Sequence, residues 1–227
     1  LADVGDPVEL GARYALEGAD ELVYLDITAS KEGRSTFTKM VERVADRVNI
    51  PFTVGGGISS LDDAAALLDA GADKITVNSA AVANPSLVSE IASKYGSQFV
   101  VVAIDAKTVD DGSWRITTHG GSRLTDIELF EWARRVQDLG AGEILFTSMN
   151  HGGTRSGYPC DTYAALASLL DIPVIASGGA GSVKDIADVL TDGRADAALA
   201  ASIFHYGEIT IDALKRQLSE LNIPVRL

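Results

Sequence analysis

One buried strand of the predicted fold ends in a carboxylate. The apolar run from Phe99 to Ile104 is followed by Asp105, and Lys107 lies two residues further on. A continuous apolar run of this length, rich in β-branched residues, is typical of a strand buried on both faces. A charge is costly to place at the end of such a strand, and in barrel enzymes this edge carries the active site. We therefore interpret Asp105 as a candidate acid–base residue and Lys107 as a pocket residue. The alternative is that Asp105 only caps the following loop.

Two glycine-rich turns indicate phosphate binding. Gly56 and Gly57 follow one predicted strand, and Gly178 and Gly179 follow another. Glycine lets backbone N–H groups approach an anion closely, and the helix that follows adds a favourable dipole. Asn78-Ser79 and Ala201-Ser202 end the neighbouring strands and add polar groups. Because the device occurs twice, half a barrel apart, it suits a substrate with a phosphate at each end; the alternative is a pair of ordinary tight turns.

Further polar residues are expected at both ends of the strands. Asp26 and Thr53 end strands at the Asp105 edge, where they could line the pocket or cap helices. The loop 148–157 contains Gly153 and Thr154 and has the composition of a flexible substrate-contacting loop. At the opposite edge Glu21, Lys74 and Glu143 stand at strand starts. Ordinary ion pairing is the default interpretation there, because that face of a barrel usually serves stability.

Short apolar runs alternate with amphipathic runs along the whole chain, which predicts βαβ units and a parallel sheet. The expected helices are Pro7–Glu17, Thr36–Arg47, Leu61–Ala70, Pro85–Lys94, Thr125–Leu139, Asp161–Leu170, Ser182–Leu190 and Ile211–Leu221. The expected strands are Glu21–Asp26, Phe52–Gly55, Lys74–Asn78, Phe99–Asp105, Glu143–Ser148, Val174–Ser177 and Ala197–Ala201. The polar stretch Thr108–Arg123 is interpreted as a hairpin or lid after the central strand.

An internal repeat predicts an α/β fold of the (β/α)8 TIM barrel type, built from two half-barrels. Residues 19–26 match residues 141–148, and residues 50–57 match residues 172–179 at the same offset. Residues 72–79 match 195–202 with one insertion. We predict a single domain over 1–227, with half-barrels of about 1–97 and 98–227. The repeat partner of Phe99–Lys107 would precede Leu1, so we expect the first strand of the barrel to be absent from this chain.

Composition excludes several classes of function. The net charge of −13 argues against nucleic acid as a partner, because counterion release needs Lys/Arg patches. No apolar stretch reaches membrane-spanning length. The single cysteine, Cys160, and three scattered histidines predict no metal site and no cofactor, and fit a cytoplasmic protein.

Several stretches together resemble the cyclase subunit of imidazole glycerol phosphate synthase, of the histidine pathway. They are Gly5–Leu10, Asp20–Ser30, Val54–Ile58, Asn78–Val82, Val102–Lys107, Gly140–Leu145 and Ile175–Gly181. The likeness runs from Leu1 to Leu227. Asp26-Ile27-Thr28-Ala29-Ser30 and Ala103-Ile104-Asp105-Ala106-Lys107 are the motifs that separate this family from its isomerase sister, which shares the repeat and the two phosphate sites.

The resemblance implies a reaction and a set of roles. The family converts N′-[(5′-phosphoribulosyl)formimino]-AICAR ribonucleotide and ammonia to imidazole glycerol phosphate and AICAR ribonucleotide. Ammonia comes from a separate glutaminase subunit and travels through the barrel. The resemblance makes Asp105 one of two catalytic carboxylates, places Glu21, Lys74 and Glu143 in an ammonia gate, and makes Asp73 a contact to the glutaminase.

Three departures from the family leave alternatives open. The family's first strand, with its second catalytic aspartate, has no counterpart in the chain. Gly152 stands where the family usually has an aspartate, and Asn150 stands where aspartate is common. The alternatives are the isomerase sister, which would turn over its substrate without ammonia, and an inactive truncated barrel that only docks the glutaminase.

Overall fold

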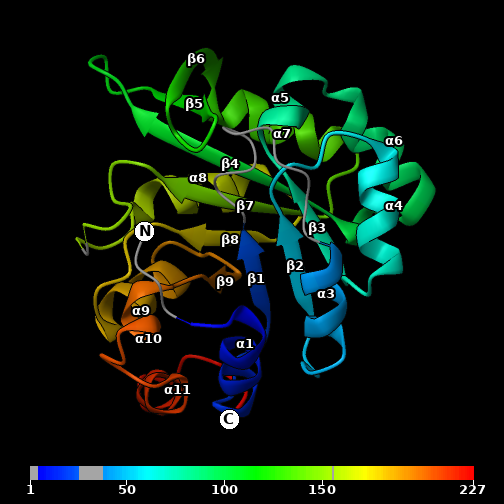
Figure 1. Cartoon of the computed structure of the whole chain (residues 1–227). Coiled ribbons are helices and arrows are strands. Elements are labelled where there is room, and N and C mark those ends of the chain that lie inside the picture. The colour runs from blue at the N-terminus through cyan, green and yellow to red at the C-terminus, as the bar shows by residue number, and fades with distance from the viewer. Residues whose placement is uncertain (1–4, 26–37, 155) are drawn as a thin grey trace.

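Seven parallel strands form one curled sheet. The structure, a computed structural model, describes residues 5–25, 38–154 and 156–227. The parallel strands lie in the order β1-β2-β3-β4-β7-β8-β9, and the hairpin strands β5 and β6 extend from β4 (Figure 1). The strands are β1 (Leu22–Leu25), β2 (Phe52–Gly55), β3 (Lys74–Val77), β4 (Val100–Thr108), β5 (Trp114–Thr118), β6 (Arg123–Glu128), β7 (Glu143–Ser148), β8 (Val174–Ser177) and β9 (Ala197–Ala198). Among the described residues β1 pairs only with β2, and β9 only with β8. The predicted α/β barrel architecture is confirmed.

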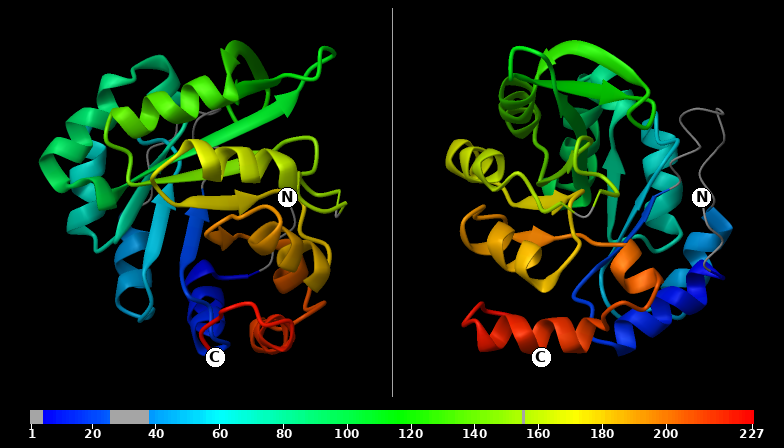
Figure 2. Two further views of the ribbon diagram at one scale, coloured as in Figure 1. Left: turned by 180° about the vertical axis from the view of Figure 1, so that it is seen from behind. Right: turned by 90° about the vertical axis from the view of Figure 1, so that its left-hand side faces the viewer.

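Helices cover the outer side of the curl, as the views in Figures 1 and 2 show. They are α1 (Pro7–Leu16), α3 (Thr38–Ala45), α4 (Leu61–Asp69), α5 (Ser79–Ala83), α6 (Ser86–Tyr95), α7 (Leu129–Asp138), α8 (Cys160–Leu169), α9 (Val183–Thr191), α10 (Ser202–His205) and α11 (Ile211–Glu220), with a short 3-10 turn at Ser97–Phe99. No described helix combines the length and apolar character needed to cross a membrane.

The central strand β4 shows how the sheet divides core from interior. Val100, Val102, Ile104 and Ala106 are fully buried in the main hydrophobic core. Because side chains alternate along a strand, Val101, Ala103, Asp105 and Lys107 face the inside of the curl. Asp105 and Lys107 therefore lie on the interior face, toward the carboxyl end of the strand.

The hairpin after the central strand is confirmed, and it corrects one expected helix. Residues 125–128 were expected to begin a helix but belong to β6, because β6 pairs with β5 in an antiparallel ladder. Glu128 then accepts hydrogen bonds from the N–H groups of Phe130 and Glu131 and so starts α7 at Leu129. Strand β4 continues to Thr108, three residues beyond its expected end, because β5 pairs with it from Asp105 onward.

Short elements at the strand ends also differ from expectation. Helices α5 and α10, which start at Ser79 and Ser202, were not expected, since four or five residues are too few to show a helical period. The expected strand Ala197–Ala201 is only the two residues of β9.

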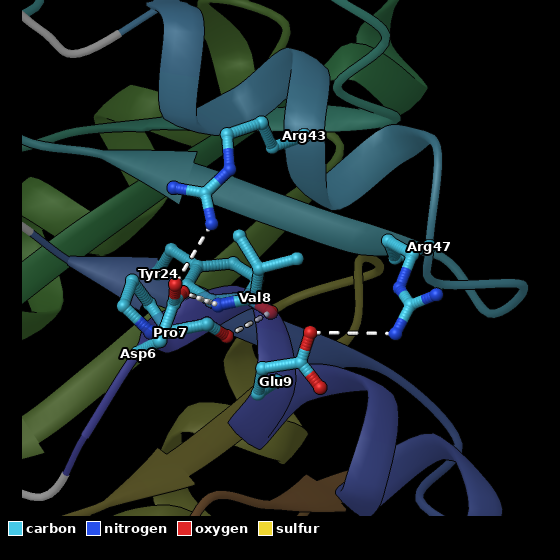
Figure 3. Close-up of polar contacts among 7 residues, drawn as sticks. All are labelled: Asp6, Pro7, Val8, Glu9, Tyr24, Arg43 and Arg47. Carbon is cyan, nitrogen blue, oxygen red and sulfur yellow. Dashed lines mark hydrogen bonds and ion pairs between the residues drawn. The ribbon is translucent and has the colours of Figure 1, made fainter.

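Ion pairs join the first two described helices on the surface (Figure 3). Asp6 caps α1 by accepting from the Val8 N–H at 2.8 Å, and Arg43 of α3 reaches the same carboxylate at 2.7 Å. Arg47 pairs with Glu9 at 3.3 Å. These contacts are exposed and therefore each add little to stability.

Candidate active site

Asp105 lies at the centre of a small hydrogen-bonded group. Its Oδ2 accepts a hydrogen bond from Asn78 Nδ2 at 2.9 Å, and its carboxylate also accepts one from the Thr147 side chain. Its backbone oxygen accepts from Thr117 Oγ1 of the hairpin at 3.1 Å. Burial raises the pKa of Asp105, and the bonds from Asn78 and Thr147 lower it only in part. A carboxyl whose pKa is raised toward neutrality is suited to exchange protons with a substrate.

The other predicted pocket residues lie at different depths. Lys107 shares the interior face of β4 with Asp105 and is partly buried. Thr53 of β2 is 3% exposed and lies low in the barrel, opposite Lys74 in the β2–β3 register. Asp26 lies outside the described residues. Lys107 thus lies near Asp105 as expected, whereas Thr53 does not end its strand, because β2 continues to Gly55.

The first glycine turn has the predicted backbone form. Gly56 and Gly57 have φ of 109° and 70°, values that L side chains rarely adopt. Ser79, the first residue of α5, follows the neighbouring strand, and its Oγ accepts the backbone N–H of His119 at 2.9 Å. This hydroxyl oxygen already accepts one hydrogen bond, so its own proton can be donated to an anion.

The second glycine turn is enclosed more tightly. Gly178 and Gly179 have φ of 80° and 143°, and a Cβ on Gly179 would stand 2.4 Å from the Gly157 oxygen. Tyr163 Oη donates to the backbone oxygen of Phe146 at 2.8 Å and accepts the Ser177 N–H at 3.1 Å. Ala201 and Ser202 stand at the start of α10, on the neighbouring strand end.

Polar groups of the loop after β7 form hydrogen bonds within the loop or to the end of β4. Thr154 Oγ1 donates to the His151 backbone oxygen at 2.9 Å and lies 2.7 Å from Ser156 Oγ. Asn150 Oδ1 accepts the Thr108 N–H, which fastens the loop to the end of β4. Gly153, with φ of 73°, is exposed, so phosphate binding by Gly153 and Thr154 stays a prediction.

Three charged residues, called the charged ring below, lie at the opposite end of the barrel interior. Lys74 Nζ lies 2.8 Å from Glu21 Oε2 and 2.6 Å from Glu143 Oε1. Burial alone would lower the pKa of Lys74, but hydrogen bonds and attraction from both glutamates outweigh it and raise that pKa. The three residues predicted for the gate are thus brought together; their role in passing ammonia stays a prediction.

Asp73 has a structural partner. Its Oδ2 accepts the Phe52 N–H at 2.9 Å, and Asp196 makes the same bond to the Val174 N–H at 2.8 Å. The internal repeat makes these two aspartates equivalent. Because both halves contain the same bond, we interpret it as a structural contact that holds the start of a strand. Asp73 also borders a surface hollow that is lined by Val48, Ile50, Pro51 and Gly71.

Sequence reasoning missed Thr117, His119 and Thr147 as neighbours of the site. Thr147 stands near the end of a predicted strand, and this position was the available signal. His119 has a left-handed φ of 55°, and nothing in the neighbouring sequence was used to predict this conformation. The described residues contain no cluster of three or more His, Cys, Asp or Glu that could hold a metal ion.

Comparisons with known proteins place the chain among histidine-pathway proteins. A family model described as "Histidine biosynthesis protein" matches residues 1–210. A protein of Phocaeicola vulgatus is 59% identical over all 227 residues, which is 90% of its own length. A protein of Parabacteroides distasonis is 57% identical over 99% of this chain and 89% of its own length, and one of Flavobacterium johnsoniae is 55% identical over 100% and 90%. All three carry the name "Imidazole glycerol phosphate synthase subunit HisF".

Proposed function

The chain belongs to the histidine biosynthesis protein family and is the cyclase subunit of imidazole glycerol phosphate synthase, and we propose on this basis that Asp105 carries acid–base chemistry in ring closure. Addition of ammonia, elimination and ring closure each move protons to or from nitrogen and oxygen. The position of Asp105 supports this role. Its carboxylate faces the barrel interior, is half-buried and has a pKa that burial raises.

The substrate carries a phosphate at each end in this proposal. The first phosphate is held by the Gly56-Gly57 turn with Asn78 and Ser79, and the second by the Gly178-Gly179 turn with Ala201 and Ser202. The left-handed backbone of both turns supports the assignment, as do the hydroxyls of Ser79 and Ser202 at the starts of α5 and α10, after the neighbouring strands. Two fixed ends would stretch the substrate across the interior face, beside Asp105.

Ammonia enters from the opposite end of the barrel in this proposal. Lys74, Glu21 and Glu143 form the gate, and the partner is a glutaminase subunit that docks on the same end and supplies ammonia. The name "subunit" of the relatives supports a partner. The hollow beside Asp73 supports the choice of surface, because it lies at the starts of β2 and β3 on the gate side.

The test is a steady-state assay of imidazole glycerol phosphate formation with an ammonium salt as nitrogen source. We expect Asp105→Asn to lower kcat by about 10²–10⁴-fold, the usual contribution of a general acid–base group. Asp46→Asn is the matched control, because Asp46 is exposed in the turn that follows α3. Wild-type turnover by Asp105→Asn would refute the assigned role.

A further inference from the structure

Asn78 stands out because, in the part of the chain that the structure describes, one end of its amide has a hydrogen-bond partner and the other end has none. Its Nδ2 donates to Asp105 Oδ2 at 2.9 Å. Its Oδ1 is buried and has no hydrogen-bond partner among the described residues. Buried polar atoms are almost always paired, so an unpaired one at a candidate active site calls for an explanation.

The direction of the amide follows from simple electrostatics. An ionised carboxylate only accepts hydrogen bonds, so Nδ2 is the end of the amide that can face it. The reversed amide would place two acceptors against each other. The observed orientation therefore matches ionised Asp105, and it directs Oδ1 away from the carboxylate to accept from another group.

Within residues 5–25, 38–154 and 156–227, no charged side chain takes the place of this bond to Asp105. The charged or titratable groups on the elements packed around it are Lys74 on β3, Lys107 on β4, Arg115 on β5, Glu143 on β7, and His119 and His151 in the adjoining loops. None of these described groups contributes to the pKa of Asp105, which is set by burial and by the bonds from Asn78 and Thr147. Among the described residues, the bonds from Asn78 and Thr147 are the interactions that favour the ionised form of Asp105.

We propose that Asn78 is a positioning residue for Asp105, which orients the ionised carboxylate through Nδ2 and accepts an N–H of the reacting substrate through Oδ1. Oδ2 of Asp105 is occupied by this bond, so the remaining lone pairs of the carboxylate receive the substrate proton. The proposal goes beyond phosphate binding by Asn78, and its kinetic consequences rest on the proposed cyclase function.

The kinetic test compares three variants with the wild type. Asn78→Asp keeps the shape and removes the donor, and Asn78→Ala removes both ends of the amide. Thr76→Val is the matched control, because Thr76 on β3 also has a buried hydroxyl with no hydrogen-bond partner among the described residues, and it makes no hydrogen bond to Asp105. The measurement is kcat/KM against pH at a fixed concentration of free ammonia.

We expect the acid limb of this profile to move to higher pH in Asn78→Ala and further in Asn78→Asp. Loss of the donor makes Asp105 about tenfold harder to ionise, and the new carboxyl adds repulsion. Thr76→Val should leave the limb in place. A fall in rate with an unmoved acid limb in both Asn78 variants would overturn the proposal.

A second measurement does not need activity. The carboxyl carbon of Asp105, assigned by its absence in Asp105→Asn, is titrated by NMR in the full chain labelled with ¹³C-aspartate. A higher titration midpoint in Asn78→Ala and Asn78→Asp supports the proposal even if the cyclase assignment fails. An unchanged midpoint overturns it, whatever Asp105→Asn does to turnover.

Discussion

The two halves of the barrel hold their glycine turns in different ways. In the first half, the His119 N–H, from the turn of the β5–β6 hairpin, donates a hydrogen bond to Ser79 beside the turn of Gly56 and Gly57. In the second half the buried hydroxyl of Tyr163 ties the end of β8 to β7, directly before Gly178. Val41 occupies the position equivalent to Tyr163 and offers no hydrogen bond. The first turn is thus fastened by a segment outside the repeat, and the second by a side chain within it.

Other contacts are the same in both halves. Ser60 and Ser182 cap equivalent helices by accepting from the N–H groups of Asp63 and Asp185. Asp73 and Asp196 accept equivalent backbone N–H groups. The comparison teaches that helix starts and strand entries follow the repeat, whereas the surroundings of the candidate site have diverged from it.

Removal of the Tyr163 hydroxyl is the strongest test of this difference. Tyr163→Phe leaves the Ser177 N–H and the Phe146 oxygen without their partner in a buried region. We expect the free energy of unfolding in urea to fall by about 2–3 kcal/mol. Leu166→Met, at a buried position of the same helix, is the control and should change it by less than about 1.5 kcal/mol, because the swap conserves volume. Equal losses in the two variants would contradict the divergence described above.

The charged ring gives the next largest effect. Lys74→Met leaves Glu21 and Glu143 facing each other without their cation, and we expect a loss of about 2 kcal/mol, since the ring is only partly buried. Ala197→Met, at the equivalent position of the second half, is the control, because Ala197 is exposed. A similar loss in both variants would show that size, and not charge, decides the result.

The same ring makes stability depend on alkaline pH. The pKa of Lys74 is higher in the folded chain than in the unfolded one. Its stabilising contribution is therefore complete below the unfolded pKa and disappears as the pH rises through the folded pKa. In urea unfolding between pH 10 and pH 12, above the ordinary pKa of 10.5, we expect stability to fall more steeply for the wild type than for Lys74→Met. Parallel curves would refute this linkage.

Asp73 and Asp196 are equivalent in the repeat, so their replacement should lower the free energy of unfolding equally if both have only a structural role. Asp73→Ala and Asp196→Ala each remove the acceptor of a strand-entry N–H, and we expect each to cost about 1–2 kcal/mol of unfolding free energy. Asp73→Ala should in addition weaken binding of the glutaminase subunit, measured by titration calorimetry, whereas Asp196→Ala should not. If both variants bind the glutaminase subunit equally well, the proposed contact between Asp73 and that subunit is contradicted.

The two serine caps give the smallest expected effect. Ser60→Ala and Ser182→Ala should each lower the unfolding free energy by about 1 kcal/mol, because each leaves one helix-start N–H without its acceptor. Thermal unfolding of the pair checks this. A difference of more than about 1 kcal/mol between them would show that the repeat does not extend to these helix starts.

The pattern of hydrophobic residues predicted the parallel strands more accurately than it predicted the short helices and the start of α7. Strands β2, β7 and β8 have the expected bounds, because continuous apolar runs there end at glycine or polar residues. The start of α7 was misplaced because residues 125–128 pair with β5, and a pairing partner leaves no local signal in the sequence.

The same distinction applies to the candidate site. Asp105 and the ring of Glu21, Lys74 and Glu143 stand at strand ends, where a charge next to an apolar run marks them. Thr147, His119 and Tyr163 were missed, because their importance comes from hydrogen bonds between elements distant in sequence. Such bonds depend on the folded arrangement and leave no periodic pattern.

The charged ring also bears on the construction of new barrels from duplicated halves. Glu21 and Glu143 are equivalent in the repeat, but the equivalent of Lys74 is Ala197. A barrel made from two copies of the second half would therefore contain Glu143 twice and no lysine between the copies. In that barrel, Ala197→Lys in both copies should pair two lysines with the two glutamates and give a neutral ring, so that one position per half decides whether the duplicated chain can close without charge repulsion.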